Sequence, residues 1–225
     1  MRRVVHLYRS TVGKKVAMAA SGAVLFLWII GHMLGNLKTF QGPEHINDYA
    51  EGLRTVGGPF FGPGQLLWLI RLVMIALVAI HILAALQLWL LARRARPVGY
   101  HTPPHLEISY ASRTLRWGGV IIFLYVGYHL MHFTLGTVHP DFRPGDVYHN
   151  LVVGFRSWPV VAVYILATGA LGFHLYHGVW SALQTLGINH ARYNRYRRAV
   201  AAVVAVGLFL GFVSVPVAVL AGVLR

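Results

Sequence analysis

Cysteine is absent from this 225-residue sequence. A chain without thiols cannot build a disulfide, a thiolate zinc site, a thioether link to haem or an iron–sulfur cluster from its own residues. Any redox role of this chain therefore requires a cofactor that is held without covalent attachment, and haem b meets that requirement.

Charged residues are also scarce, at 12% of the chain, against about 25% in soluble domains. Five stretches hold about 20 or more mostly apolar residues, enough to cross a bilayer core of ~30 Å. Because backbone polar groups in lipid must pair within their own segment, these stretches should be helices. The sequence predicts an all-α integral membrane bundle of five transmembrane helices in one domain over 1–225, with helices near 14–38, 65–93, 113–138, 158–187 and 196–224.

Acidic residues number only six, and the formal net charge is +14. Fourteen basic residues and one acid fall before the first helix and in the second and fourth connections. The opposite helix ends carry five basic and five acidic residues. This asymmetry follows the positive-inside rule and predicts a bacterial cytoplasmic (inner) membrane protein with a cytoplasmic N-terminus and an external C-terminus. Topology thus explains most of the basic charge without nucleic acid, although the basic face could also dock an acidic cytoplasmic subunit.

Histidine is abundant, with 13 residues, and six of them lie inside the expected spans: His32, His81, His129, His132, His174 and His177. A titratable ring in a bilayer is costly and usually faces the interior of the bundle with a partner. One such histidine is more often an interhelical contact than a ligand, but four successive helices each carry at least one. Since the iron of haem b takes two axial imidazoles from opposite sides, four helices could hold two haem b groups.

Depth within the membrane suggests how the four histidines pair. Counted from the outer helix ends at ~1.5 Å per residue, His32 lies about 9 Å deep and His129 about 15 Å deep. His81 and His174 lie about 26 Å and 24 Å deep by the same count. We therefore expect an outer haem iron bound by His32 and His129, and an inner haem iron bound by His81 and His174.

Three further residues are candidates for roles beside the haems. His132 and His177 lie one turn from His129 and His174, on the same general face. Each could be the ligand itself, or could hydrogen-bond a propionate, a ligand or a quinone. Arg71 is the one charge well inside a span, and it either snorkels outward or pairs with a propionate of the outer haem.

Glycines flank these histidines at Gly31, Gly35, Gly127, Gly169, Gly172 and Gly178. Small residues at these positions are typical of close helix packing in membranes. They also provide room for a flat macrocycle to approach the backbone. Both interpretations stay open at this point.

Several segments resemble the cytochrome b558 family, the membrane anchors of succinate dehydrogenase and fumarate reductase. The matching segments are 31–37 in the first span, 68–81 in the second, 127–132 in the third and 172–187 in the fourth, the last being the most specific. The resemblance covers essentially the whole chain and implies ligands at His32, His81, His129 and His174. It also implies a flavoprotein and an iron–sulfur partner on the cytoplasmic side, and a quinone substrate, often menaquinone in this type.

The quinone site does not carry over from the resemblance, because its residues vary within the family. Five of the six acids lie on the outer side, so a second hypothesis places proton relay for a quinone at Glu44, His45, Asp48 and Glu51. Four alternatives remain for the whole chain: a quinol:fumarate reductase anchor, a cytochrome b subunit of another membrane oxidoreductase, a transporter with proton-relay histidines, or a haem-free anchor.

Overall fold

The computed structural model describes residues 8, 10–58, 60–95, 110–185, 187, 190 and 192–225. This part of the chain is helical and contains no strand. Its elements are α2 (Thr11–Leu37), the 3-10 turn η1 (Lys38–Gln41), α3 (Pro43–Thr55), α4 (Gln65–Arg94), α5 (Tyr110–Phe133), α6 (Val147–Gly154), α7 (Trp158–Thr185) and α8 (Asn194–Leu220).

Four helical segments within the described residues are long and apolar enough to cross a membrane: Thr11–Gln41, Gln65–Arg94, Trp158–Thr185 and Tyr196–Leu220. The expected bundle of five such helices is not confirmed, because α5 is not among them. Two histidines and two tyrosines lie in the second half of α5 and lower its mean hydropathy. The all-helical character and the membrane-spanning character of the chain both follow from these segments.

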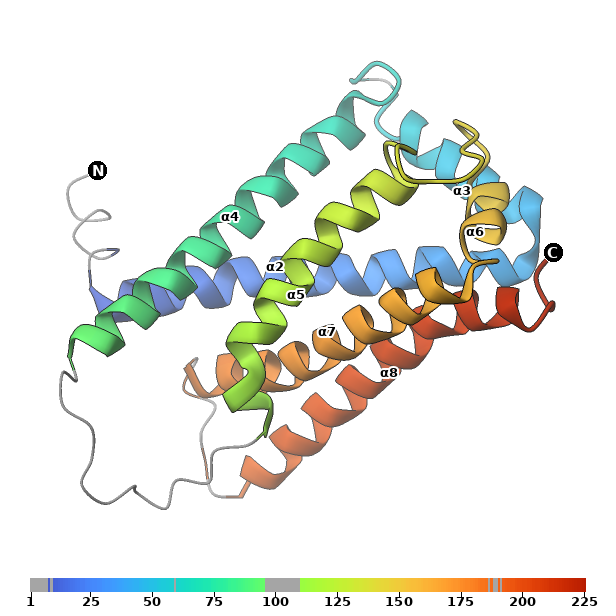
Figure 1. Ribbon diagram of the computed structural model, residues 1–225. Coiled ribbons are helices and arrows are strands. Elements are labelled where there is room, and N and C mark those ends of the chain that lie inside the picture. Colours follow the sequence, from blue (N-terminus) through green and yellow to red (C-terminus); the bar gives the residue numbers. More distant parts are fainter. Residues whose placement is uncertain are drawn as a thin grey trace.

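The long helices run between the two ends of an elongated bundle (Figure 1). Helix α7 packs along both α5 and α8, while α2 packs chiefly on α4 and also touches α7 and α8. The short helices α3 and α6 pack on each other at one end. This arrangement places α2, α4, α5 and α7 around a shared interior, and these are the four helices that carry the candidate histidines.

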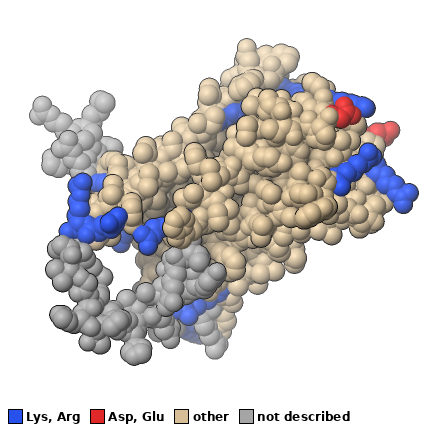
Figure 2. All heavy atoms as spheres, in the orientation of Figure 1, with Lys and Arg blue, Asp and Glu red and all other residues tan. Residues whose placement is uncertain are grey.

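The two ends of the bundle differ in charge. We call the end formed by α3 and α6 the α3–α6 end, and the opposite one the basic end. Figure 2 shows Lys and Arg at both ends, whereas the visible Asp and Glu side chains lie at the α3–α6 end. Described basic residues at the other end include Lys14, Lys15, Arg93, Arg94, Arg116 and Arg198. The charge asymmetry expected from the sequence is therefore present between the two ends of the fold.

The buried apolar core of the described residues lies near the α3–α6 end. It is formed by Leu151 and Val152 of α6, Val161 and Tyr164 of α7, and Val215 and Val219 of α8, together with Phe155 and Leu224 outside these helices. Elsewhere the long helices expose large apolar side chains such as Leu27, Leu166 and Val203. Apolar surface of this extent is costly in water and suits contact with lipid.

Two helices end earlier than the sequence suggested. The third expected helix was extended to Val138, but α5 ends at Phe133, and Gly136 adopts a left-handed φ of +72°. The last expected helix was extended to 224, but α8 ends at Leu220, and Gly222 also has a φ of +72°. The backbone N–H of Gly222 donates to the carbonyl of Val219, and the N–H of Val223 donates to the carbonyl of Ala218. This is a glycine C-cap, which apolar periodicity does not reveal.

A polar network holds the short helices together at the α3–α6 end. The Asp146 carboxylate caps α6 by accepting from the backbone N–H of His149 at 3.0 Å. The Asn47 side chain in α3 donates to the same carboxylate at 3.1 Å and accepts from the Tyr148 N–H at 3.0 Å. Neither α3 nor α6 belongs to the five long apolar stretches of the sequence. Their packing closes this end of the bundle.

Acidification should weaken this cap. The backbone N–H of His149, and after it the side chain of Asn47, hold the pKa of Asp146 below its ordinary value of 3.8. Because the folded pKa is the lower one, the stabilisation is complete above 3.8 and is lost as the pH falls through the folded value. We expect the thermal midpoint of the detergent-solubilised chain to drop over that acidic range. Asp146→Asn should flatten the dependence, and an equal acid sensitivity in that variant would contradict this role.

Candidate functional site

Four histidines on four long helices meet in two pairs. The ring centroids of His32 in α2 and His129 in α5 lie 5.8 Å apart, and those of His81 in α4 and His174 in α7 lie 6.1 Å apart. Helices α2 and α5 end at the α3–α6 end, where His32 lies five and His129 four residues before the last helical residue. Helices α4 and α7 begin at that end, and His81 and His174 each lie 16 residues after the first helical residue. The pairs are thus roughly 16 Å apart along the bundle.

These are the pairs that the depth count suggested. We call the pair near the α3–α6 end, His32 with His129, the outer pair, and His81 with His174 the inner pair. The structure brings their rings together, and iron ligation by them stays a prediction. The physical reason for the agreement is that straight helices of similar length convert sequence position into depth at a constant rise.

Neighbouring groups orient both rings of the outer pair. The ring of His32 stacks on Trp28 of the preceding turn, with centroids 4.8 Å apart and planes within 12°. The Nδ1 atom of His129 lies 3.4 Å from the hydroxyl oxygen of Tyr164 in α7. A neutral imidazole with its proton on Nδ1 keeps a free lone pair on Nε2, which is the form that binds a metal.

The inner pair has a different set of partners. Nδ1 of His81 lies 3.0 Å from the Met18 carbonyl oxygen and 3.4 Å from the Ser21 hydroxyl. Since a carbonyl only accepts, the proton resides on Nδ1 and Nε2 is left free. A β-carbon on Gly22 would lie 3.1 Å from His81, so glycine permits this close approach of α2. Nδ1 of His174 is buried and has no hydrogen-bond partner among the described residues.

The distance between ring centroids in both pairs is close to that of two imidazoles that share one iron. Metal–nitrogen distances of about 2 Å, with about 1.2 Å from ring nitrogen to ring centre, would place the centroids about 6.4 Å apart. The observed 5.8 Å and 6.1 Å are slightly shorter. No group of three or more His, Cys, Asp or Glu converges in the described part of the chain. Such pairs suit haem, whose porphyrin supplies the remaining four ligands, better than a site built from protein ligands alone.

The neighbouring histidines form no comparable pair between long helices. His132 is fully buried, with its Nδ1 3.0 Å from the Tyr164 hydroxyl and its ring 5.1 Å from that of His139 in the loop after α5. His177 contacts Trp180 edge-to-face at 5.9 Å. One ring nitrogen of each, Nε2 of His132 and Nδ1 of His177, is buried without a partner among the described residues. The structure therefore favours His129 and His174 as the facing residues.

The guanidinium carbon of Arg71 lies 4.8 Å from the ring centre of Trp68, one turn earlier in α4. Arg71 makes no ion pair with a described residue. The stacking satisfies part of its charge through a cation–π interaction. Pairing of Arg71 with a haem propionate stays a prediction.

The flanking glycines divide into two groups. At three of them an added β-carbon would lie within 4 Å of a neighbouring helix. It would meet Tyr49 at Gly35, and Phe209 at Gly169 and Gly172. At the other three, Gly31, Gly127 and Gly178, nothing lies within 4 Å of such a carbon. The first group serves helix packing, and the second borders open space beside the histidines, which is compatible with a cofactor or with lipid.

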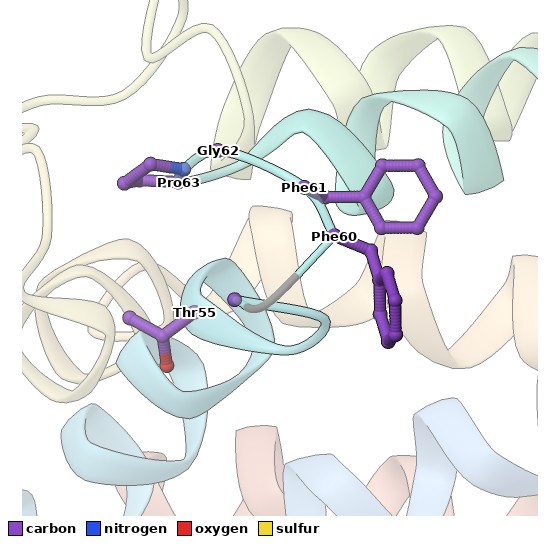
Figure 3. A pocket seen from close by; sticks show the side chains of 6 residues that line it. Thr55, Phe60, Phe61, Gly62 and Pro63 are labelled. Carbon is purple, nitrogen blue, oxygen red and sulfur yellow. The ribbon is translucent and has the colours of Figure 1, made fainter.

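The candidate quinone residues lie on the exposed surface of α3. His45, Asp48 and Glu51 are all exposed, and Glu51 pairs with Arg54 at 2.9 Å. A pocket of about 420 Å³ lies where α3 ends and the following loop begins, lined by Thr55, Gly58, Phe60, Phe61, Gly62 and Pro63 and drawn in Figure 3. None of these three residues lines this pocket.

Tyr164 is a site residue that the sequence reasoning missed. It lies six residues after the start of α7, close in depth to His129, and its hydroxyl contacts both His129 and His132. The depth count applied to every polar ring, rather than to histidines alone, could have found it. Gly154 was also missed, although a β-carbon there would lie 3.0 Å from Nε2 of both His132 and His139.

Comparison with known proteins identifies no relative. No protein-family model, no curated protein and no solved structure matches this chain. The resemblance to the cytochrome b558 anchors therefore rests on the motif residues, and the two histidine pairs are the structural feature that bears on function.

Proposed function

We propose that this chain is the haem b-carrying membrane anchor of a succinate:quinone oxidoreductase. The supporting observation is the pair of facing histidines at each of two depths, 5.8 Å and 6.1 Å between ring centroids. Buried imidazoles are costly in a membrane unless they have a partner. Two haem groups would give all four of these rings the same kind of partner.

The proposal includes α5 as a fifth membrane-crossing helix. Its 24 residues span about 36 Å at 1.5 Å per residue, more than a bilayer core of ~30 Å. It packs along α7 and exposes apolar side chains such as Phe123 and Leu124. Its polar rings, His129 and His132, face the interior of the bundle or the α3–α6 end, where lipid does not need to accommodate them.

In this proposal the basic end faces the cytoplasm of a bacterial cell and receives a flavoprotein and an iron–sulfur subunit. The positive-inside rule supports this orientation, and the resemblance of the motif residues supports the partners. A quinone, menaquinone by the same resemblance, would react near the α3–α6 end. The histidine pairs lie between these two sides, at two depths roughly 16 Å apart.

His32 with His129 would hold the outer haem b, and His81 with His174 the inner one. When bound, haem b supplies one-electron transfer between partners on opposite sides of the bundle. The residues of this chain orient the ligand rings through Trp28, Tyr164 and the Met18 carbonyl. The apolar side chains around the rings exclude water, and the membrane helices keep the two pairs at different depths.

The helix architecture favours this function over transport. Transporters typically have broken helices near the bilayer midplane, whereas α2, α4 and α7 are continuous over 27, 30 and 28 residues. Helix α8 contains one proline, Pro216, which lies near its outer end and far from mid-span. The described spans therefore show no break near mid-span of the kind that is typical of transporters.

A reduced-minus-oxidised spectrum of the complex purified through this chain tests the proposal directly. We expect a b-type haem spectrum with two haems per chain and co-purification of a flavoprotein and an iron–sulfur protein. A complex without haem would overturn the haem assignment. Two haems with a different catalytic partner would instead identify the cytochrome b subunit of another oxidoreductase.

A further inference from the structure

A single tyrosine hydroxyl lies between two imidazoles at the outer pair. The Tyr164 oxygen is 3.4 Å from Nδ1 of His129 and 3.0 Å from Nδ1 of His132. Tyr164 is buried within the core at the α3–α6 end, where its ring also contacts Phe155 edge-to-face at 4.8 Å. The hydroxyl is thus held in place by the packing of its own ring, and it has one proton to share between two nitrogens.

Two proton arrangements keep the hydroxyl proton of Tyr164 in a hydrogen bond within this group of three residues. A hydroxyl has one donor and two acceptor sites, and a neutral imidazole has one donor and one acceptor. In one arrangement His129 Nδ1–H donates to Tyr164, and Tyr164 donates to Nδ1 of His132. In the reverse arrangement Tyr164 donates to His129, whose proton must then reside on Nε2.

Only the first arrangement allows His129 to bind iron through Nε2, because a protonated Nε2 has no lone pair to offer. It assigns the proton of His132 to Nε2, the nitrogen that has no partner among the described residues. Metal binding at His129 therefore determines the direction of both hydrogen bonds and the tautomer of His132, one helical turn away.

We propose that Tyr164 is a positioning residue of the outer pair, which accepts a hydrogen bond from His129, donates one to His132 and lowers the reduction potential of the haem held there. This inference rests on the proposed function. An acceptor on the far nitrogen of a ligand imidazole increases the basicity of the ligand, which favours ferric over ferrous iron. Donation to His132 makes the tyrosine oxygen a better acceptor, since chained hydrogen bonds strengthen one another.

The inner pair provides an internal comparison. The far nitrogen of His81 is bonded to a backbone carbonyl, that of Met18, which a side-chain substitution in α7 does not remove. Tyr164 is on the outer half of its helix, ten residues from His174. A change at Tyr164 should thus affect the outer haem and leave the inner one unchanged.

Redox titration of the purified complex tests the proposal with Tyr164→Phe, which removes the hydroxyl and keeps the ring. At a fixed potential the reduced-to-oxidised ratio of the outer haem should rise about threefold to tenfold, equivalent to about 30–60 mV for a one-electron couple. The outer haem is identified by its loss in a His129→Leu complex. The inner haem should titrate as in the unaltered complex.

Three further variants, at two residues, separate positioning from general damage to the core. Tyr125→Phe removes a hydroxyl from the same aromatic cluster, 5.1 Å from Tyr164 between ring centroids, and should leave both potentials unchanged. His132→Leu should raise the outer potential by less than Tyr164→Phe, and His132→Asn, which keeps an acceptor near the Nδ1 position, should restore it.

Each outcome decides one of the two claims. Two haems with an unchanged outer potential in Tyr164→Phe would overturn the positioning role and leave the proposed function intact. Equal shifts of both haems, or a similar shift in Tyr125→Phe, would also overturn it. Absence of haem from the unaltered complex would overturn the proposed function, and this inference with it.

Discussion

Replacing His174 with leucine is expected to remove one of the two haems proposed for this chain and to leave the other. Leucine fills a similar volume but offers no lone pair to iron. A haem in this site would therefore have only one of its two axial histidine ligands. His174 faces His81 across 6.1 Å, while the outer pair lies about 16 Å away. The reduced-minus-oxidised haem absorbance per chain should therefore fall to about half. The His81→Leu variant should show the same loss of absorbance.

Adjacent histidines supply the matched controls. His177 lies one turn from His174, has a buried ring nitrogen without a described partner and faces Trp180 rather than another histidine. His177→Leu should keep both haems, and so should His190→Leu at an exposed position. Loss of a haem in His177→Leu with retention in His174→Leu would show that the ligand is the residue one turn further along α7.

The outer pair should behave in parallel. His32→Leu and His129→Leu should each remove the other haem, and the double variant of His32 and His174 should carry none. Loss of one haem in each single variant and of both in the double variant would indicate two separate sites. The reason is that substitutions at distant sites without shared partners have additive effects. Loss of both haems in every single variant would instead indicate that the pairs assemble as one unit.

Gly136→Ala is expected to cause the largest loss of stability at the α3–α6 end. The backbone of Gly136 has a φ of +72°, and a β-carbon there would overlap the Phe142 ring. A left-handed conformation costs a non-glycine residue about 1–3 kcal/mol, and overpacking adds a similar amount. We expect the free energy of unfolding to fall by about 2–6 kcal/mol, measured by denaturation of the detergent-solubilised chain.

Gly52→Ala is the control for this substitution. Gly52 lies in α3 at the same end of the molecule, its φ is in the ordinary helical range, and nothing lies within 4 Å of an added β-carbon. Alanine in a helix is favoured over glycine by up to about 1 kcal/mol, so this variant should be as stable as the original or more so. Equal destabilisation by both substitutions would contradict the steric argument at Gly136.

The sequence predicted depth well because depth depends on a constant rise along each helix. Residue counting alone assigned His32 to the level of His129 and His81 to the level of His174. Helix ends were predicted less well, since α5 and α8 end near Gly136 and Gly222, where apolar residues continue beyond the helix. A long apolar segment shows that a helix can exist, and the glycine turn that terminates it depends on a few backbone dihedral angles.

The composition of the chain by itself determined the helical fold class, the apolar spans and the abundance of histidine within them. Only the tertiary structure decided that the facing rings are His129 and His174 rather than His132 and His177, because rotation about a helix axis is set by packing between helices. It alone showed the Tyr164 hydroxyl between His129 and His132, since residues 32 and 35 positions apart become neighbours only when α5 and α7 pack together. The absence of cysteine retains its first meaning, because it excludes a thioether link between this chain and a haem.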